Sequence, residues 1–147
     1  MQVSSADPYD LQRFIDAQCS TFDAALAELR DGAKRSHWMW FIFPQIAGLG
    51  SSPTAELYAI RSLGEARAFL DHPLLGARLR RCVELLLTWA ATRGAADILG
   101  ELDALKLRSS LTLFDAAAPE NIFGRALDAL FRGERDVRTL ALLDSAR

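Results

Sequence analysis

Apolar residues recur at every third or fourth position along most of this 147-residue chain, which is the spacing of one face of an α-helix. The most regular stripe lies between Pro119 and Gly133 and consists of Ile122, Phe123, Ala126, Leu127, Leu130 and Phe131. The helix predicted to be longest starts at Asp71-His72-Pro73, ends at Gly94, and carries the stripe Leu75, Leu79, Cys82, Val83, Leu86 and Ala90. A helix over 102–117 places Leu107, Leu111 and Phe114 on one side. These stripes predict an all-α fold.

Capping residues indicate where the other helices begin. Asp7 with Pro8 is typical of a helix start, and Asp136 is expected to open the last helix. Ser20 and Ser62 are each followed three residues later by a carboxylate, which is the spacing of a capping box. Gly32 stands where a left-handed residue ends a helix.

The chain shows no hairpin signal, no internal repeat and no long Pro/Gly/Ser-rich linker. We therefore expect one compact domain over 1–147, with an ordered core over about 7–143. Six to eight helices should form a bundle whose helices cross orthogonally rather than run up and down.

Two neighbouring segments depart from the helical pattern. Residues 34–45 read KRSHWMWFIFPQ, and residues 46–54 form a Gly/Ser/Pro-rich loop. Periodicity alone leaves 38–43 as either a buried strand or a buried helix, and Ser36 as N-cap with Pro44 as stop favours a short helix. In either conformation neighbouring aromatic side chains point in different directions, so at least one should line a cleft, and we assign that place to Trp40.

Composition and charge narrow the class of protein. Half of the residues are hydrophobic and 24% are charged, which is typical of a globular domain. The formal net charge of −2 argues against broad nucleic-acid binding. The segment 1–6 has no signal-peptide pattern, and no apolar run is long enough to span a bilayer, so we expect a cytoplasmic protein without a membrane segment.

Cysteine and histidine are too sparse for a metal site. The two cysteines, Cys19 and Cys82, lie far apart and are expected to be buried and unpaired. With only two histidines as well, the sequence predicts no metal and no cofactor.

Three stretches together resemble a known family. The segment KRSHWMWFIFPQ with the GLG-SS loop, the segment YAIRSLGEARAFLDHPLLGARL and the segment DALKLRSSLTLF are similar to the bacterial and fungal family called domain of unknown function 1810. Its members are often labelled "calpastatin", a name that nothing in this sequence supports. The resemblance covers about 9–143 and implies a compact helical fold with no assigned activity.

The order of the motifs also resembles, more distantly, the helical family that acts on ADP-ribose derivatives and related N-glycosides. In that family a histidine-aromatic motif and a lysine-bearing helix line the ligand pocket. His37 and Lys106 are the residues to which this resemblance extends. The acidic residue that the family places just before its histidine is Ser36 in this chain.

The residues themselves point to the helix over 102–117 as a candidate catalytic element. Asp103, Lys106 and Ser110 fall at i, i+3 and i+7 and therefore share one face. A lysine in a cleft stabilises a phosphate or a developing oxyanion, and a carboxylate one turn away fixes its position. The alternative is an ordinary exposed ion pair between Asp103 and Lys106.

The aromatic segment and its loop supply the other candidates. His37 either hydrogen-bonds a ligand or makes a structural contact, whereas His72 is expected to cap a helix. Gln45, Ser51 and Ser52 lie on or beside the Gly-rich loop, where amide and hydroxyl groups either bind a ligand or form an ordinary loop.

These observations support two hypotheses on function. The first is a binding site for a planar, phosphorylated small molecule of the nucleotide or ADP-ribose type, with cleavage of an N-glycosidic bond as the reaction if the protein is an enzyme. Catalytic roles then fall to Lys106, Asp103 and His37, and ligand contacts to Trp40, Gln45, Ser51, Ser52 and Ser110. The alternative is a non-catalytic protein-interaction or adaptor module, in which the same residues would scatter rather than converge on a pocket.

Overall fold

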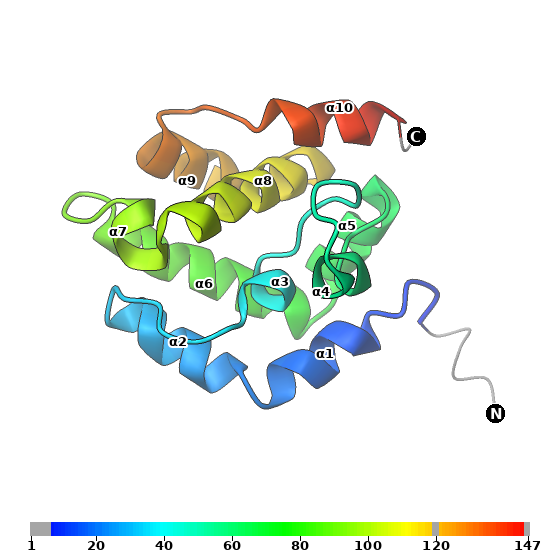
Figure 1. Cartoon of the computed structure of the whole chain (residues 1–147), viewed down its shortest axis with the longest axis horizontal. Coiled ribbons are helices and arrows are strands. Elements are labelled where there is room, and N and C mark those ends of the chain that lie inside the picture. Colours follow the sequence, from blue (N-terminus) through cyan, green and yellow to red (C-terminus); the bar gives the residue numbers. More distant parts are fainter. Residues whose placement is uncertain (1–6, 119–120, 146–147) are drawn as a thin grey trace.

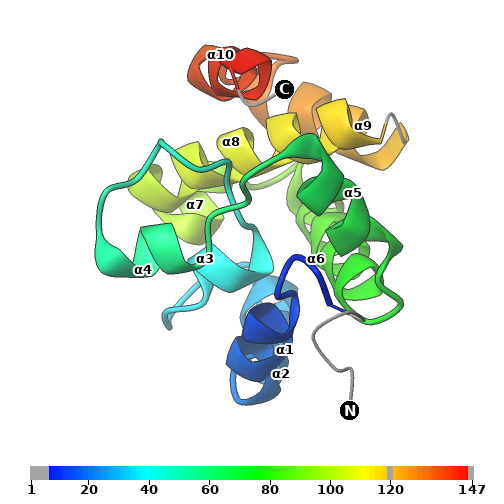
Figure 2. The ribbon, with the colours of Figure 1, turned by 90° about the vertical axis from the view of Figure 1, so that its right-hand side faces the viewer.

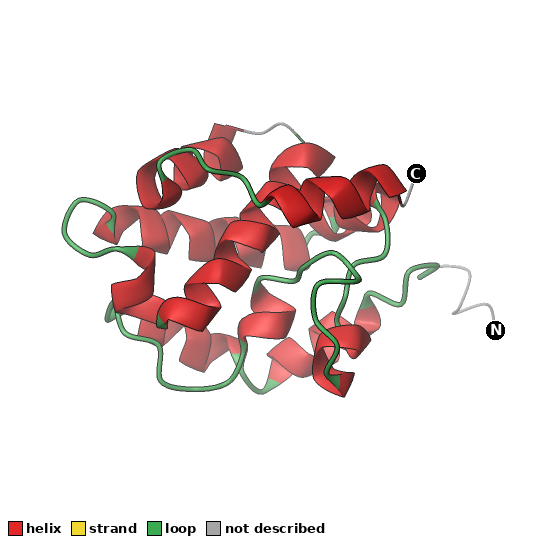
Figure 3. Ribbon diagram, turned by 45° about the horizontal axis from the view of Figure 1, so that its top comes forward, coloured by secondary structure: helices red, strands yellow, loops and turns green. Residues whose placement is uncertain are grey.

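The computed structural model describes residues 7–118 and 121–145, and these residues form ten helices. The helices are α1 (Gln12–Cys19), α2 (Phe22–Arg30), α3 (Met39–Ile42), α4 (Pro53–Leu57), α5 (Leu63–Asp71), α6 (Leu75–Trp89), α7 (Ala95–Leu99), α8 (Glu101–Ala117), α9 (Asn121–Phe131) and α10 (Val137–Ser145). Figure 3 shows no strand in the described part of the chain, and the extended backbone is limited to one isolated parallel bridge between Ile46 and Ile60. The predicted all-α class is confirmed.

The predicted number of six to eight helices is wrong, because α4 and α7 were not expected. Each has only five residues, so neither is long enough to show a repeat of apolar spacing. The helix predicted to be longest is also shorter than expected. Helix α6 has 15 residues and ends well before Gly94, whereas α8 has 17.

Several predicted helix ends are confirmed by their hydrogen bonds. Ser62 Oγ accepts the N–H of Glu65 at 3.1 Å, and His72 Nδ1 accepts the N–H groups of Leu74 and Leu75. Asp136 caps α10 by accepting the N–H of Thr139 at 3.0 Å. Gly32 and Gly133 follow α2 and α9 with positive φ angles of 68° and 79°.

Other predicted ends are wrong for local reasons. Asp7 does accept backbone N–H groups, but α1 begins only at Gln12 because Asp10 has a left-handed φ of 52° and interrupts the first turn. Helix α2 is preceded by Thr21 rather than Ser20, and no side chain caps it. Pro119, the predicted start of α9, and the segment 1–6 lie outside the described residues.

The helices stack in tiers around one contiguous core. Figures 1 and 2 both show α1 and α2 on one side, α10 on the opposite side, and α6 and α8 between them. A row of aromatic rings links four helices: Phe14 lies 5.1 Å from Phe69, Phe69 lies 5.4 Å from Phe114, and Phe114 lies 5.9 Å from Phe123. This row joins α1, α5, α8 and α9 at the centre of the fold.

Burial at the edges of the core departs from the prediction in two places. Cys82 is buried as expected, but Cys19 is exposed at the end of α1. Phe131, the last residue of the α9 stripe, is only partly buried. None of the described helices has the length and apolar character needed to cross a membrane.

We expect the two phenylalanines of α9 to differ in their contribution to stability. Phe123 is fully buried against Phe114, so Phe123→Ala should lower the free energy of unfolding by about 3–5 kcal/mol. Phe131→Ala should lower it by about 1–2 kcal/mol, because part of that ring already contacts solvent. Urea denaturation of both variants checks this, and equal losses would contradict the assignment of Phe123 to the core.

Candidate functional site

A buried carboxylate on α2 fixes the start of the aromatic segment. Glu28 accepts hydrogen bonds from Ser36 Oγ at 2.6 Å, Trp38 Nε1 at 2.9 Å, and the backbone N–H groups of Arg35 and Ser36 at 2.7 and 3.0 Å. Ser36 was predicted to cap α3, and this prediction is wrong. The residue before α3 is Trp38, and the Ser36 hydroxyl instead donates its hydrogen bond to Glu28.

These hydrogen bonds determine the charge state of Glu28. Burial by itself would raise the pKa of this carboxyl group, but the donors of Ser36, Arg35 and Trp38 stabilise the ionised form and lower the pKa from 4.5 to about 2. Glu28 is therefore a buried anion held by hydrogen bonds.

The short helix α3 distributes the aromatic side chains over two environments. Trp38, Phe41 and Phe43 are buried in the core, whereas Trp40 is only half-buried. The segment is thus helical rather than a strand, and its turn directs one large aromatic ring away from the core.

A chain of charges and rings connects this segment to α8. Lys34 Nζ lies 5.2 Å from the Trp38 ring centroid and 2.9 Å from Asp103 Oδ2. Lys106 Nζ lies 3.1 Å from Asp103 Oδ1 and 4.7 Å from the Trp40 ring centroid. One carboxylate is therefore shared by two lysines, and each lysine also contacts a tryptophan.

The environment of Asp103 keeps it ionised. Partial burial tends to raise its pKa, but hydrogen bonds and charge from Lys34 and Lys106 outweigh burial and leave the pKa below its ordinary value. The pair between Asp103 and Lys106 is therefore not the isolated exposed ion pair that was the alternative.

Three cavities share lining residues near α3 and α8, and we name each by its lining. The lysine cavity, of about 410 Å³, is lined by Lys34, His37, Trp40, Asp103 and Lys106 among others. The loop cavity, of about 300 Å³, lies between Trp40, Gln45, Tyr58 and the loop 46–50. The arginine cavity, of about 260 Å³, lies between Gln45, Gly50, α8 and the start of α10.

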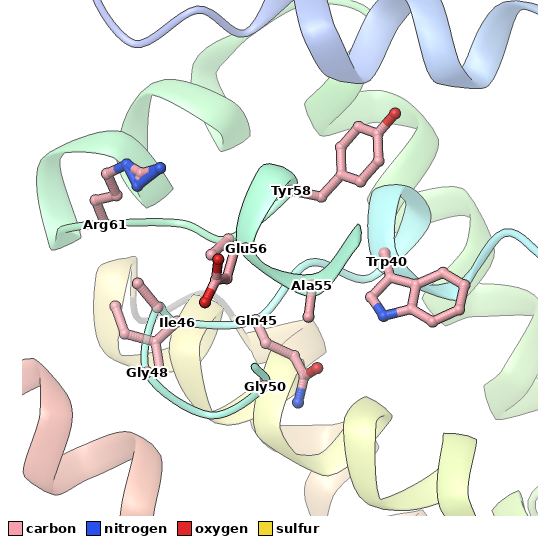
Figure 4. Close-up of a pocket in the computed structure, with 11 residues that line it drawn as sticks. Trp40, Gln45, Ile46, Gly48, Gly50, Ala55, Glu56, Tyr58 and Arg61 are labelled. Carbon is pink, nitrogen blue, oxygen red and sulfur yellow. The ribbon is translucent and has the colours of Figure 1, made fainter. Parts of the chain in front are cut away.

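The cavities share lining residues, so together they form one depression that we call the Trp40 groove. Trp40 lines the lysine and loop cavities, Gln45 lines the loop and arginine cavities, and Lys106 lines the lysine and arginine cavities. Figure 4 shows Trp40 and Arg61 at opposite sides of the loop cavity, with Gln45 and Glu56 between them.

Backbone contacts hold the loop 46–50, which forms one wall of the loop cavity. The N–H of Ala47 bonds to Ile60 O and the N–H of Ile60 bonds to Gln45 O, both at 2.8 Å. Position 50 has no room for a side chain, because a Cβ atom there would lie 2.7 Å from Ala55 Cβ. The loop is thereby fixed against the start of α4.

The structure brings most of the predicted site residues together. His37, Trp40, Asp103 and Lys106 line the lysine cavity, and Gln45 lines the arginine cavity with Lys106. His37 and Gln45 therefore both share a cavity with Lys106, although they lie far from it in sequence.

The three predicted serines lie elsewhere. Ser110 is fully buried, and its hydroxyl has no hydrogen-bond partner within 7–118 and 121–145. Ser51 and Ser52 are exposed and line none of the three cavities, and Ser52 instead caps α4 by accepting the N–H of Ala55 at 3.1 Å. Sharing a helical face with Lys106 does not bring Ser110 into the groove, because that face turns into the core further along α8.

Sequence reasoning missed four residues of the site. Lys34 opens the KRSHWMWFIFPQ segment, so its position in that unusual motif was an available signal. Glu28, Arg108 and Arg138 lie in ordinary amphipathic stretches, and only the packing of α2, α8 and α10 shows their relation to the groove.

No group of three or more His, Cys, Asp or Glu residues suited to a metal ion occurs in the described ranges. The groove therefore offers cationic, aromatic and amide groups rather than a ligand set for a metal.

Comparison with known proteins gives two matches. The family described as "Protein of unknown function (DUF1810)" matches residues 8–143. The crystal structure of the conserved hypothetical protein Rv1873 from Mycobacterium tuberculosis is similar, with a TM-score of 0.90 and 49% sequence identity over 94% of this chain and 99% of that chain. No curated protein matches the sequence at a significant level. The resemblance to domain of unknown function 1810 is confirmed, and the one to the ADP-ribose family stays a prediction.

We expect Glu28→Gln to destabilise the protein in a pH-dependent way. Because the folded pKa is lower than the unfolded one, the ionised carboxylate stabilises the fold fully above pH 4.5, and this stabilisation is lost as the pH falls toward about 2. The difference in pKa corresponds to about 3 kcal/mol. The side-chain amide of the glutamine would also place its own N–H groups against the hydrogen-bond donors that Glu28 accepts from.

Urea denaturation at pH 7, 4.5 and 2.5 measures this effect. The loss in Glu28→Gln should be about 3 kcal/mol at pH 7 and should shrink toward pH 2.5. Asp23→Asn, at an exposed carboxylate in the first turn of the same helix, is the matched control and should change little. A loss that stays constant between pH 7 and 2.5 would show that the charge of Glu28 is not what matters.

Proposed function

The chain belongs to the DUF1810 family, and we propose that its Trp40 groove binds a planar, phosphorylated small molecule of the nucleotide or ADP-ribose class. The observation that carries this proposal is that Trp40, Gln45 and Lys106 each line two of three neighbouring cavities. Polar residues from distant segments surround one concave surface there, as expected for a ligand site.

The chemistry of the three shared residues supports a ligand with an aromatic base. The Trp40 side chain is only partly buried, which leaves some of its ring surface for stacking on a planar group. The Gln45 carboxamide supplies one donor group and one acceptor for the polar edge of a base. Lys106 is held over the same indole at 4.7 Å and supplies a positive charge for a phosphate.

Lys106 is positioned for this role before any ligand binds. Asp103 fixes its ammonium group at 3.1 Å, while Lys34 offsets part of the carboxylate's charge from the other side at 2.9 Å. A cation that is already ordered loses less conformational freedom on binding an anion than a free surface lysine does.

The lysine cavity also contains groups suited to cleavage of an N-glycosidic bond. In such a hydrolysis, water adds to the anomeric carbon and the base leaves with a proton. Trp40 would stack on the base, His37 would hydrogen-bond the leaving base, and Lys106, oriented by Asp103, would stabilise charge. The observation that favours this reaction is that all four side chains line one cavity of about 410 Å³.

The convergence of polar residues argues against an adaptor without a ligand. An adaptor would use a flat apolar surface, and two exposed leucines of α8 do lie in the groove, Leu102 in the lysine cavity and Leu105 in the arginine cavity. They line the same concave surfaces as Lys106, however, and are therefore part of a pocket rather than of a flat patch.

We expect Lys106→Ala to separate binding from stability. Lys34 still pairs with Asp103 in this variant, so the free energy of unfolding should change by less than about 1 kcal/mol. Calorimetric titration with ADP-ribose should nevertheless show a loss of affinity of tenfold or more, and chromatography of incubated N-glycosides should show no release of base.

The matched control is Arg81→Ala, which removes a cation from an i,i+3 ion pair on α6 outside the groove. This variant should bind ADP-ribose as the natural chain does. If neither ADP-ribose nor any other nucleotide binds the natural chain, or if Lys106→Ala binds as tightly as it, the proposed function is wrong and the adaptor takes its place.

A further inference from the structure

The three cavities of the groove differ in formal charge. The lysine cavity has two lysines balanced by Glu101 and Asp103, and the loop cavity has Arg61 balanced by Glu56. The arginine cavity has three cations, Lys106, Arg108 and Arg138, and a single carboxylate, Asp136. Lys106 is shared with the lysine cavity, where its charge is already balanced, so Arg108, Arg138 and Asp136 leave a formal excess of +1. The arginine cavity is the only one of the three with an excess.

The carboxylate in the arginine cavity is already used by other groups. Asp136 Oδ2 accepts hydrogen bonds from Thr139 N at 3.0 Å, Thr139 Oγ1 at 2.5 Å and Ser109 Oγ at 3.2 Å. Its other oxygen lies 3.9 Å from Arg108 Nη2, which is longer than a hydrogen bond. Asp136 therefore caps α10 and forms a long ion pair with Arg108 without a hydrogen bond to it.

Arg108, which lines this cavity, has a side-chain donor without a hydrogen-bond partner among the described residues. Its Nε atom is buried and has no hydrogen-bond partner in the part of the chain that the structure describes. Buried donors of this kind are rare in folded proteins, because each one loses its hydrogen bonds to water without replacement. The Arg108 side chain as a whole is 28% exposed, and a guanidinium group matches the oxygens of a phosphate, which it can bind through two parallel hydrogen bonds.

The walls of the cavity come from elements that the fold holds together. Lys106 and Arg108 lie on α8, Arg138 lies in the first turn of α10, and these two helices pack against each other. Gln45 and Gly50 form the opposite side and also line the loop cavity, so the arginine cavity adjoins the loop cavity, which Trp40 lines.

We propose that the arginine cavity is the phosphate subsite of the groove, and that the ligand is a diphosphate diester of the ADP-ribose type. This rests on the proposed function, since the base of the same ligand would lie at Trp40. A diphosphate esterified at both ends carries two negative charges, and the cavity offers it two arginines together with Lys106. Lys106, between the two parts of the groove, contacts the end of the diphosphate nearer the base.

Calorimetric titration of the full chain with adenosine, ADP-ribose and inorganic pyrophosphate tests the subsite. We expect the natural chain to bind ADP-ribose at least tenfold tighter than adenosine. Raising the KCl concentration from about 50 to 200 mM should weaken the binding of ADP-ribose and leave that of adenosine nearly unchanged, because only the former depends on charge.

Two variants test whether the arginine cavity is where the phosphates bind. Arg108→Gln keeps most of the side chain's length and removes the charge, and Arg138→Ala changes an exposed residue that the fold does not need. Each should reduce the affinity for ADP-ribose by at least fivefold and leave the affinity for adenosine unchanged. Arg81→Ala is the control for loss of one positive charge, and circular dichroism verifies folding. If Arg108→Gln fails to fold, Arg138→Ala alone decides.

The outcomes separate this proposal from the proposed function. If ADP-ribose binds both arginine variants as tightly as the natural chain but binds Lys106→Ala weakly, the phosphate subsite is wrong and the groove remains the ligand site. If pyrophosphate binding is lost in the arginine variants while no nucleoside binds, the subsite stands and the planar ligand is wrong. If adenosine, ADP-ribose and pyrophosphate all fail to bind the natural chain, both proposals are overturned.

Discussion

The Glu28 carboxylate is the constraint on which the arrangement around Trp40 depends. A buried charge without a positive partner would be costly, and four hydrogen bonds from the segment 35–38 offset that cost. These bonds fix the turn before α3 in one conformation. The orientation of α3 then follows, with the Trp38 ring in the core and the Trp40 ring toward the groove.

Asp103 couples this anchored segment to α8. It binds Lys34 from the segment and Lys106 from its own helix, so the two lysines have a fixed separation. The two contacts between lysines and indole rings add to this arrangement. Ionic and aromatic contacts therefore hold both sides of the lysine cavity.

The two ends of the Trp40 groove differ in the charge of the side chains that line them. The region at Trp40 is aromatic and electrically balanced, whereas the region between α8 and α10 has an excess of positive charge. A ligand with a planar base at one end and phosphates at the other matches this order. The conserved hypothetical protein Rv1873 from Mycobacterium tuberculosis shares the fold with 49% identity.

The sequence by itself determined the parts of the fold that depend on neighbouring residues. The long stripes of α8 and α9, the caps at Ser62, His72 and Asp136, and the left-handed glycines at 32 and 133 are encoded within one or two helical turns. The unusual segment 34–45 also indicated where a site would lie, since one of its aromatic rings had to leave the core.

Only the tertiary structure decided which side chains meet. The Ser36 hydroxyl donates a hydrogen bond to Glu28 and does not cap α3. Ser110 is buried in the core although it shares a helical face with Lys106. The pairing of Lys34 with Asp103 and the approach of Arg138 to Arg108 join segments far apart in the chain. No periodicity or cap encodes such contacts, because they arise from the packing of whole helices and not from hydrogen bonds between near neighbours.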